Sequence, residues 1–308
     1  MRRRKIGSLE VSVIGLGCNN FGGRLDLDKS SDVVFAALDN GITFFDTADI
    51  YGGTKSEEFL GQALGKRRDE VVLATKFGMQ VDAERRGAKP DYVHRALEDS
   101  LRRLATDRID LYILHAPDAD TPIADTLEAL DACVKAGKVR EIGCSNFSAD
   151  QLREAQTAVA AGAAAFVSVQ NEYSLVQREP ERQVLAECHR QGLAFVPFFP
   201  LASGLLTGKY RRGEPPPAGT RLSGMPADRL AALDEKLVMV QRLAAFAEKS
   251  GHSILELAVS WLLGHDDVAS VIAGATSRAQ VEVNATAGDW VLDDAELHEV
   301  DALATPDL

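Results

Sequence analysis

The chain has 308 residues, of which 46 are acidic and 34 basic, and its formal net charge is −12. Phosphate backbones bind local excess positive charge, so this balance argues against a non-specific nucleic-acid binder. The 4 cysteines lie far apart with no CxxC pair, which is typical of reduced thiols in a cytoplasmic protein and not of a disulfide frame or a zinc site. The uncharged stretches are too short or too interrupted by proline to span a membrane.

Short apolar runs alternate with amphipathic segments along the whole chain. There are eight such runs, at residues 13–17, 42–46, 71–76, 109–115, 139–144, 166–170, 193–198 and 269–274. Runs that are apolar on both faces predict parallel strands buried on both sides. Strands that alternate with helices in this way predict an α/β fold, a single (β/α)8 TIM barrel over residues 1–308. A short N-terminal β-hairpin and a C-terminal helix after Asp293 complete this prediction.

A doubly wound open sheet is the alternative, but its nucleotide-binding motifs are missing. Gly15 and Gly17 are followed by Asn20 where a dinucleotide fingerprint needs its third glycine. A phosphate loop is also absent, because the stretch 61–66 is followed by Arg67. Three segments instead have the spacing of helix capping boxes: Ser148 with Gln151, Ser253 with Glu256, and Ser277 with Gln280. The proline-rich stretch 211–220 is the one long loop that we expect.

Four polar side chains stand at or just beyond the ends of neighbouring predicted strands. Asp46, Lys76 and His115 each end an apolar run, and Tyr51 follows Asp46 by five residues. Taken singly, each has an ordinary structural explanation. Together they lie where barrel enzymes gather their chemistry, at the C-terminal ends of the strands. We expect Asp46 to be the counter-ion of a buried Lys76, and the ammonium to lower the pKa of Tyr51. A phenol tuned in this way can exchange a proton with a developing alkoxide while His115 orients the substrate oxygen.

These residues resemble the catalytic tetrad of the aldo-keto reductases. The resemblance rests on Asp46-Thr-Ala-Asp-Ile-Tyr51-Gly, Lys76 and Asp110-Leu-Tyr-Ile-Leu-His115, and further matches extend over roughly residues 5 to 288. The pattern is closest to the bacterial, potassium-channel-β-subunit-like branch. The resemblance implies a barrel that binds NADP(H) across its mouth and reduces aldehyde and ketone carbonyls.

The resemblance also assigns the residues that would hold the cofactor. The nicotinamide side is matched by Ser145, Asn146, Gln170 and Phe198, and the pyrophosphate side by Leu201, Ser203, Gly204 and Leu205. Phe199 stands where the family commonly has a serine, which weakens one contact to the pyrophosphate. The adenosine side is matched by Gly274, Ser277, Gln280 and Asn284, and Ser277 would open a helix whose N-terminus favours an anion.

Lys209 and Arg221 match the positions that grip the adenosine 2′-phosphate in this branch. The stretch 209–221 contains four basic residues and one acid within a chain that is acidic overall. We therefore favour NADP(H), although NAD(H) use stays open because other branches carry more basic residues at this site.

The sequence thus predicts an NADP(H)-dependent reductase of small-molecule carbonyls, with Asp46, Tyr51, Lys76 and His115 as catalytic residues. An NADP(H)-binding sensor subunit with little turnover is the alternative. A metal-dependent barrel hydrolase is disfavoured, since the histidines form no pair at ligand spacing and no metal site is expected. The physiological substrate, the reaction direction and the oligomeric state are not encoded in any motif that we recognise.

Overall fold

The computed structural model describes residues 1–305, and its centre is an eight-stranded parallel sheet. The strands are β3 (Ile14–Gly17), β4 (Phe44–Asp46), β5 (Val72–Phe77), β6 (Ile109–Leu114), β7 (Val139–Ser145), β8 (Phe166–Gln170), β9 (Ala194–Phe195) and β10 (Val271–Gly274), paired in the order β10-β3-β4-β5-β6-β7-β8-β9. Phe195 closes the ring, because its N–H donates to Asp267 O at 2.7 Å and its carbonyl accepts from Ala269 at 2.9 Å. The predicted (β/α)8 barrel is confirmed, and the open doubly wound sheet is excluded.

Alternate side chains of each strand face opposite sides of the barrel wall. Phe44, Ala74 and Leu111 belong to the cluster inside the barrel, whereas their neighbours Phe45, Leu73 and Tyr112 pack in the outer cluster under the helices. This alternation follows from the two-residue repeat of a strand. Asp46 follows Phe44 by two residues and Lys76 follows Ala74 by two, so both side chains face the inside of the barrel.

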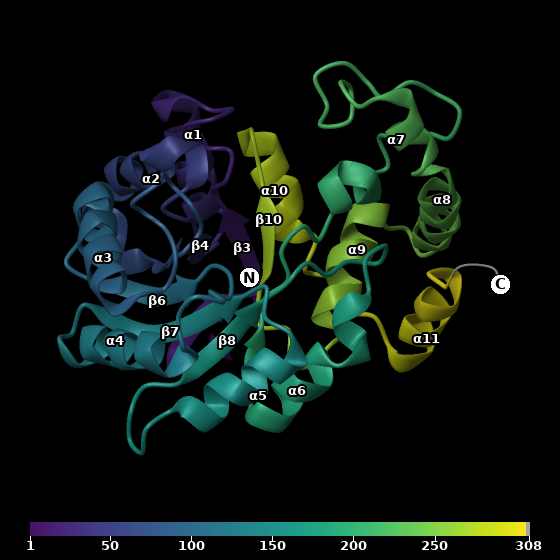
Figure 1. The fold of residues 1–308 in the computed structure, drawn as a ribbon. Helices are drawn as coiled ribbons and strands as arrows, with labels where there is room; N and C mark the ends of the chain where they lie inside the picture. Colours follow the sequence, from purple (N-terminus) through teal and green to yellow (C-terminus); the bar gives the residue numbers. More distant parts are fainter. Residues whose placement is uncertain (306–308) are drawn as a thin grey trace.

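Helices surround the sheet (Figure 1). They are α1 (Leu27–Asp39), α2 (Lys55–Leu64), α3 (Pro90–Leu104), α4 (Ile123–Lys135), α5 (Ala149–Ala158), α6 (Val184–Gln191), α7 (Ala227–Ala231), α8 (Asp234–Lys249), α9 (Ile254–Leu263), α10 (Arg278–Thr286) and α11 (Asp294–Leu303). The capping boxes predicted at Ser148 and Ser253 are both formed. At α10 the Ser277 side chain accepts from the Gln280 N–H. The Gln280 carboxamide accepts from the Thr276 N–H instead of the Ser277 N–H, so only half of the predicted capping box is formed.

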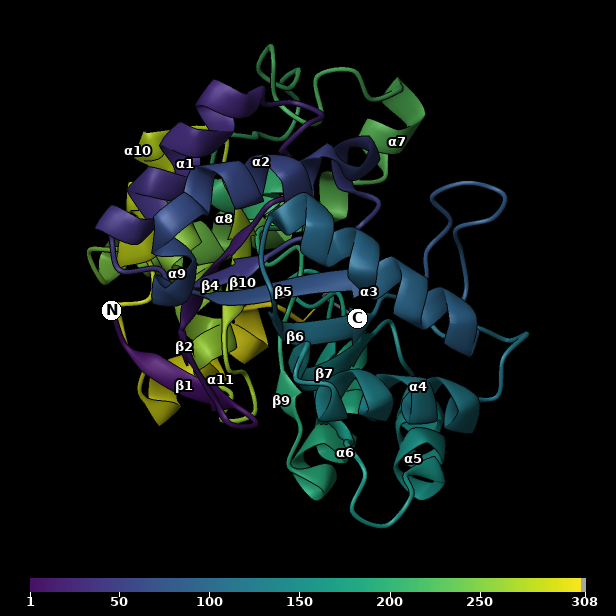
Figure 2. The same ribbon diagram turned by 90° about the vertical axis from the view of Figure 1, so that its left-hand side faces the viewer.

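The predicted N-terminal hairpin is present as β1 (Arg3–Ile6) and β2 (Leu9–Ser12). Its apolar side chains join the cluster inside the barrel. The Ser8 N–H donates at 2.8 Å to Glu141, which lies early in β7. The hairpin therefore covers the end of the barrel where the strands begin, away from the loop that follows β5 (Figure 2).

The predicted C-terminal helix is α11, which lies beside α8 (Figure 1). The Trp261 indole N–H donates to Asp301 at 3.0 Å and so ties α11 to α9. Short 3-10 turns complete the elements: η1 (Tyr51–Thr54), η2 (Gly65–Glu70), η3 (Glu179–Arg182) and η4 (Ala202–Thr207). The stretch 211–220 contains neither helix nor strand, as expected, but it is not the one long loop, because residues 78–89 between β5 and α3 also lack both. None of the helices within residues 1–305 has the length and apolar character that crossing a membrane requires.

Candidate active site

The four residues of the predicted tetrad meet at the C-terminal ends of β4, β5 and β6. The Lys76 ammonium donates to the Asp46 carboxylate and, at 2.8 Å, to the Thr47 carbonyl. The same nitrogen lies 5.2 Å from the centre of the Tyr51 ring. The rings of Tyr51 and His115 meet edge to face with centres 5.8 Å apart. The structure therefore brings the predicted residues together, and it adds the Thr47 carbonyl, which the sequence did not single out.

Lys76 and Asp46 form an ion pair that is almost closed to solvent, with side-chain exposures of 2% and 6%. Burial acts to lower the pKa of Lys76, but the charge of Asp46 and the nearby Tyr51 outweigh it, so the pKa lies above the ordinary value. Lys76 is therefore a fixed ammonium at neutral pH. Loss of either partner would leave an uncompensated buried charge.

The pKa of Tyr51 differs from the sequence-based expectation. Lys76 favours the phenolate, as we expected, but burial and the charge of Asp46 act the other way. Burial is the largest of these effects, and the pKa of Tyr51 lies above its ordinary value. The expected net lowering of the Tyr51 pKa is therefore wrong. Tyr51 is a neutral phenol at neutral pH, with a proton to give.

His115 is neutral at physiological pH. Burial and the neighbouring Lys76 lower its pKa to about 3. Its Nδ1 atom is buried and has no hydrogen-bond partner among the described residues. A neutral imidazole can donate one N–H to a carbonyl oxygen without placing a second cation beside Lys76.

A left-handed turn fixes the loop that carries Tyr51. Gly52, Gly53 and Thr54 follow it with φ angles of 59°, 64° and 78°. A Cβ atom on Gly52 would lie 2.2 Å from the Phe21 carbonyl oxygen, so only glycine allows this approach. The Tyr51 turn is thereby held against the loop that follows β3.

The amide side chains predicted to hold the nicotinamide lie at the ends of β7 and β8, next to the tetrad. Asn146 donates to the His115 carbonyl at 2.9 Å and to the Ser145 hydroxyl at 3.1 Å. Gln170 donates at 2.8 Å to the Asp46 carboxylate. The bonds to His115 and Asp46 link the two sets of predicted residues, and no motif indicated them because their partners are 31 and 124 residues apart in the chain.

The residues predicted for the pyrophosphate side form an irregular turn. Ala202, Ser203 and Gly204 have φ angles of 45°, 58° and 95°. Two N–H groups of this turn are bonded within it, since Ala202 donates to the Phe199 carbonyl and Gly204 to the Leu201 carbonyl, each at 2.8 Å. Leu201 begins this turn and Leu205 is buried beneath it. Phe198 is half-buried, and its ring meets that of Phe199 edge to face at 5.4 Å.

Two cations, Lys209 and Arg221, lie beside this turn, and Arg24 lies near Arg221; we call these three the mouth cations. Lys209 lies 5.2 Å from the ring of its neighbour Tyr210, and Arg221 lies 5.6 Å from the Phe199 ring. Burial and the positive charge of Arg24 lower the pKa of Arg221. Within residues 1–305, no carboxylate forms an ion pair with any of the three. The sequence analysis did not identify Arg24. Its position in the loop after β3, the first strand of the barrel, is the one feature that would have indicated a place near the site.

The residues predicted for the adenosine side lie around the start of α10. Gly274 is exposed at the end of β10, and a Cβ there would lie 3.4 Å from side-chain atoms of Asn19 and Asn20. Ser277 is the N-cap of α10 and is exposed, as is Gln280. Asn284 is buried at 6% exposure. The set therefore lies together, although Gln280 already bonds Thr276.

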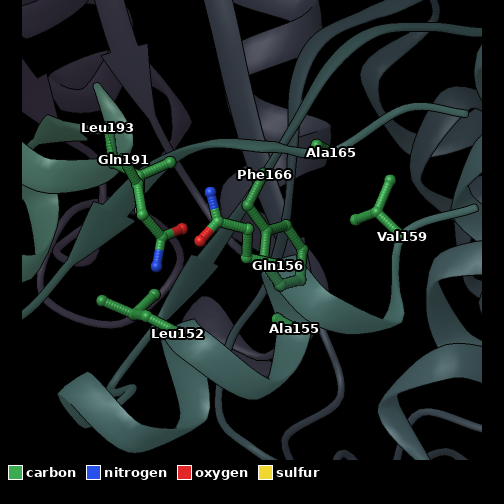
Figure 3. A pocket seen from close by; sticks show the side chains of 8 residues that line it. All are labelled: Leu152, Ala155, Gln156, Val159, Ala165, Phe166, Gln191 and Leu193. Carbon is green, nitrogen blue, oxygen red and sulfur yellow. The ribbon is translucent and has the colours of Figure 1, made fainter. Parts of the chain in front are cut away.

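A cavity of about 90 Å³ lies elsewhere, between α5 and α6 at the beginnings of β8 and β9. Figure 3 shows its apolar side chains, among them Leu152, Val159 and Phe166, with the carboxamides of Gln156 and Gln191. No charged group lines it. It lies at the opposite end of the barrel wall from the tetrad and does not belong to the candidate site. Among residues 1–305, no group of three or more side chains is arranged to hold a metal ion.

Comparison with known proteins agrees with this geometry. Residues 13–305 match the model of the Aldo/keto reductase family. Aldo-keto reductase yakc [NADP(+)] of Schizosaccharomyces pombe is 34% identical over 96% of this chain and 89% of its own. A probable voltage-gated potassium channel subunit beta of Arabidopsis thaliana is 32% identical over 94% of this chain and 92% of its own. The structure of a glycerol dehydrogenase from Gluconobacter oxydans superposes with a TM-score of 0.86 at 29% identity, over 98% of this chain and 94% of that one. The chain belongs to the aldo/keto reductase family.

Proposed function

We propose that the protein is an NADP(H)-dependent oxidoreductase that reduces the carbonyl groups of aldehydes and ketones to alcohols, with Tyr51 as the general acid. The observation that carries this proposal is the Lys76 ammonium, bonded to Asp46 and set against the Tyr51 ring. The names of the relatives support it, since one carries NADP(+) and another is a glycerol dehydrogenase.

The tetrad would act on the substrate oxygen. A carbonyl that enters beside Tyr51 and His115 would accept hydrogen bonds from the phenol and from the neutral imidazole. As negative charge develops on that oxygen, Tyr51 would transfer its proton, because the adjacent Lys76 stabilises the phenolate that remains. Asp46 would hold Lys76 in place and keep it charged.

The residues present fit a nicotinamide dinucleotide. Bound NADPH would supply the hydride. The neutral amides of Asn146 and Gln170 suit its carboxamide, and the Phe198 ring suits stacking on an aromatic base. The turn that contains Leu201, Ser203, Gly204 and Leu205 would lie against its pyrophosphate.

The mouth cations would select NADP(H) over NAD(H). Lys209 and Arg221 have no carboxylate partner among the described residues, so an additional phosphate on the ligand would be their counter-ion. Guanidinium groups bind phosphate with two parallel hydrogen bonds, which are stronger than neutral ones.

A sensor subunit with little turnover is the second candidate, favoured by the similarity to proteins named as potassium channel β subunits. Such a subunit would bind the cofactor and retain it. The complete tetrad, with His115 in place, favours the enzyme.

A panel of aldehydes and ketones, tested with NADPH and with NADH, distinguishes these functions. We expect NADPH oxidation with reactive carbonyls such as 4-nitrobenzaldehyde or methylglyoxal, and weaker use of NADH. Tight NADPH binding without turnover of any carbonyl would overturn the enzyme in favour of the sensor. Turnover with equal efficiency for the two cofactors would overturn the role of the mouth cations.

A further inference from the structure

The loop that carries Tyr51 also carries a second buried acid, Asp49. Its exposure is 2%, and its backbone N–H donates at 3.0 Å to the carbonyl of Lys76. Asp49 thus anchors the loop to the strand that supplies Lys76, two residues before Tyr51. The tetrad as described above does not use its carboxyl group.

Asp49 lies near a second buried carboxylate, Glu57, and near the cation that Glu57 binds, Arg103. Glu57 of α2 is fully buried and accepts from Arg103 and from the Thr75 hydroxyl, each at 2.6 Å. Its two oxygens are therefore satisfied, and Arg103 is already paired. Asp49 Oδ2 has a long contact of 3.5 Å from the Tyr92 hydroxyl, and Oδ1 is buried without a hydrogen-bond partner among the described residues. The backbone N–H of the neighbouring Ile50 also stabilises the carboxylate.

The other groups that face Asp49 do not compensate its charge. A narrow hollow beside Asp49 is also lined by Arg85 and by Asp99 of α3. Arg85 pairs with Asp82 at 2.7 Å and Asp99 pairs with Arg102 at 2.8 Å. From the sheet, the buried hydroxyl of Tyr112 on β6 is unpartnered among the described residues. At the end of β4, just before the loop, Asp46 is bonded to Lys76.

We propose that Asp49 is a positioning residue for Tyr51: the loop 47–54 keeps its working arrangement, anchored by the Asp49 N–H on Lys76, while the buried carboxyl is neutral, and ionisation of that carboxyl loosens the loop and lowers turnover. The inference deepens the proposed function, on which its catalytic part rests. The reason is that Arg103 is paired with Glu57. An ionised Asp49 would therefore lie beside the buried Glu57 carboxylate without a cation of its own, which is unfavourable.

The pKa of Asp49 supports this account. Burial and the charge of Glu57 raise it to about 7, and Arg103, the Ile50 N–H and the Tyr92 hydroxyl only partly oppose them. Ionisation therefore falls within the physiological range. A rate that needs the neutral acid would fall about tenfold between pH 6 and pH 8, as the neutral fraction of such a group does.

The test compares wild type with Asp49→Asn, which keeps the shape of the neutral acid and cannot ionise. We expect kcat of the wild type to fall from pH 6 to pH 8, and kcat of Asp49→Asn to stay level over that range. Asp99→Asn, which changes an acid lining the same hollow, is the matched control and keeps the wild-type profile. An identical fall in Asp49→Asn would overturn the proposal.

Two measurements do not depend on turnover. In ¹³C NMR, the carboxyl resonance that Asp49→Asn removes should titrate near pH 7, and a midpoint near 4 would overturn the proposal. The Tyr51 ring resonance, assigned with Tyr51→Phe, should shift between pH 6 and pH 8 in wild type and stay fixed in Asp49→Asn. A Tyr51 resonance that does not move in wild type would overturn it. If no carbonyl is reduced, the proposed function fails, and these resonances still decide the positioning role of Asp49.

Discussion

The tetrad and the mouth cations place positive charge at the same end of the barrel in opposite ways. Lys76 is 2% exposed, and its charge is neutralised within the chain by Asp46. Arg24 and Lys209 are exposed, Arg221 is half-buried, and none of the three has a carboxylate partner among residues 1–305. A buried charge needs an opposite charge within the folded chain, whereas water stabilises an exposed cation that has no counter-ion in the protein. The first arrangement is suited to chemistry and the second to binding a phosphate.

The same substitution in the two regions should give different stabilities. Lys76→Met leaves Asp46 buried without its cation, and we expect a loss of about 4 kcal/mol in the free energy of unfolding. Lys209→Met, the matched control, should change that free energy by less than about 0.5 kcal/mol. Urea unfolding at pH 7 measures both. Equal losses in the free energy of unfolding would contradict the distinction between the buried, paired Lys76 and the exposed, unpaired Lys209.

Removal of a mouth cation should act on the cofactor and not on the fold. Arg221→Ala should weaken NADPH binding about 30-fold, the equivalent of one charge-assisted hydrogen-bonded pair, and leave NADH binding nearly unchanged. Titration of each cofactor by fluorescence measures this. Arg212→Ala is the control, because Arg212 already pairs with Asp234 at 3.5 Å. An unchanged preference for NADPH in Arg221→Ala would count against the assignment.

His115 gives a smaller effect, which depends on pH. Its pKa of about 3 in the folded chain lies below the ordinary 6.5, so below pH 6.5 the unfolded chain takes up a proton that the folded chain refuses. This group therefore lowers stability as the pH falls, by about 1.4 kcal/mol between pH 7.5 and pH 5.5. His115→Gln should lack this contribution, and the comparison of the two unfolding curves at both pH values measures it. A pH dependence unaltered by the substitution would show that His115 titrates normally.

Most of the barrel was predictable because buried parallel strands are apolar on both faces. The run 193–198 predicted a longer strand than the structure contains, since β9 covers only Ala194–Phe195. Pro197 has no N–H to give to a ladder, so regular pairing ends before it. Beyond Phe195, the contact with β10 continues through single bonds such as that from Ile272 to the Pro197 carbonyl at 3.4 Å.

The composition of the tetrad was predictable, but its energetics were not. Asp46, Lys76 and His115 lie at or next to the ends of β4, β5 and β6. These strands follow one another in the sequence and are neighbours in the sheet, so local patterns were sufficient. The pKa of Tyr51 depends on how deeply the phenol is buried, which no motif encodes. The state of Asp49 depends on Glu57 and Arg103, which come from two different helices. Gln170 reaches Asp46 across 124 residues.

A single-turnover experiment tests the central claim, that Tyr51 supplies the proton in carbonyl reduction, most directly. Wild type and Tyr51→Phe are each loaded with NADPH and mixed rapidly with 4-nitrobenzaldehyde, and the loss of NADPH absorbance is followed. The account predicts equal NADPH affinity for the two proteins and oxidation at least about 100-fold slower in Tyr51→Phe. Oxidation at the wild-type rate in Tyr51→Phe would contradict it.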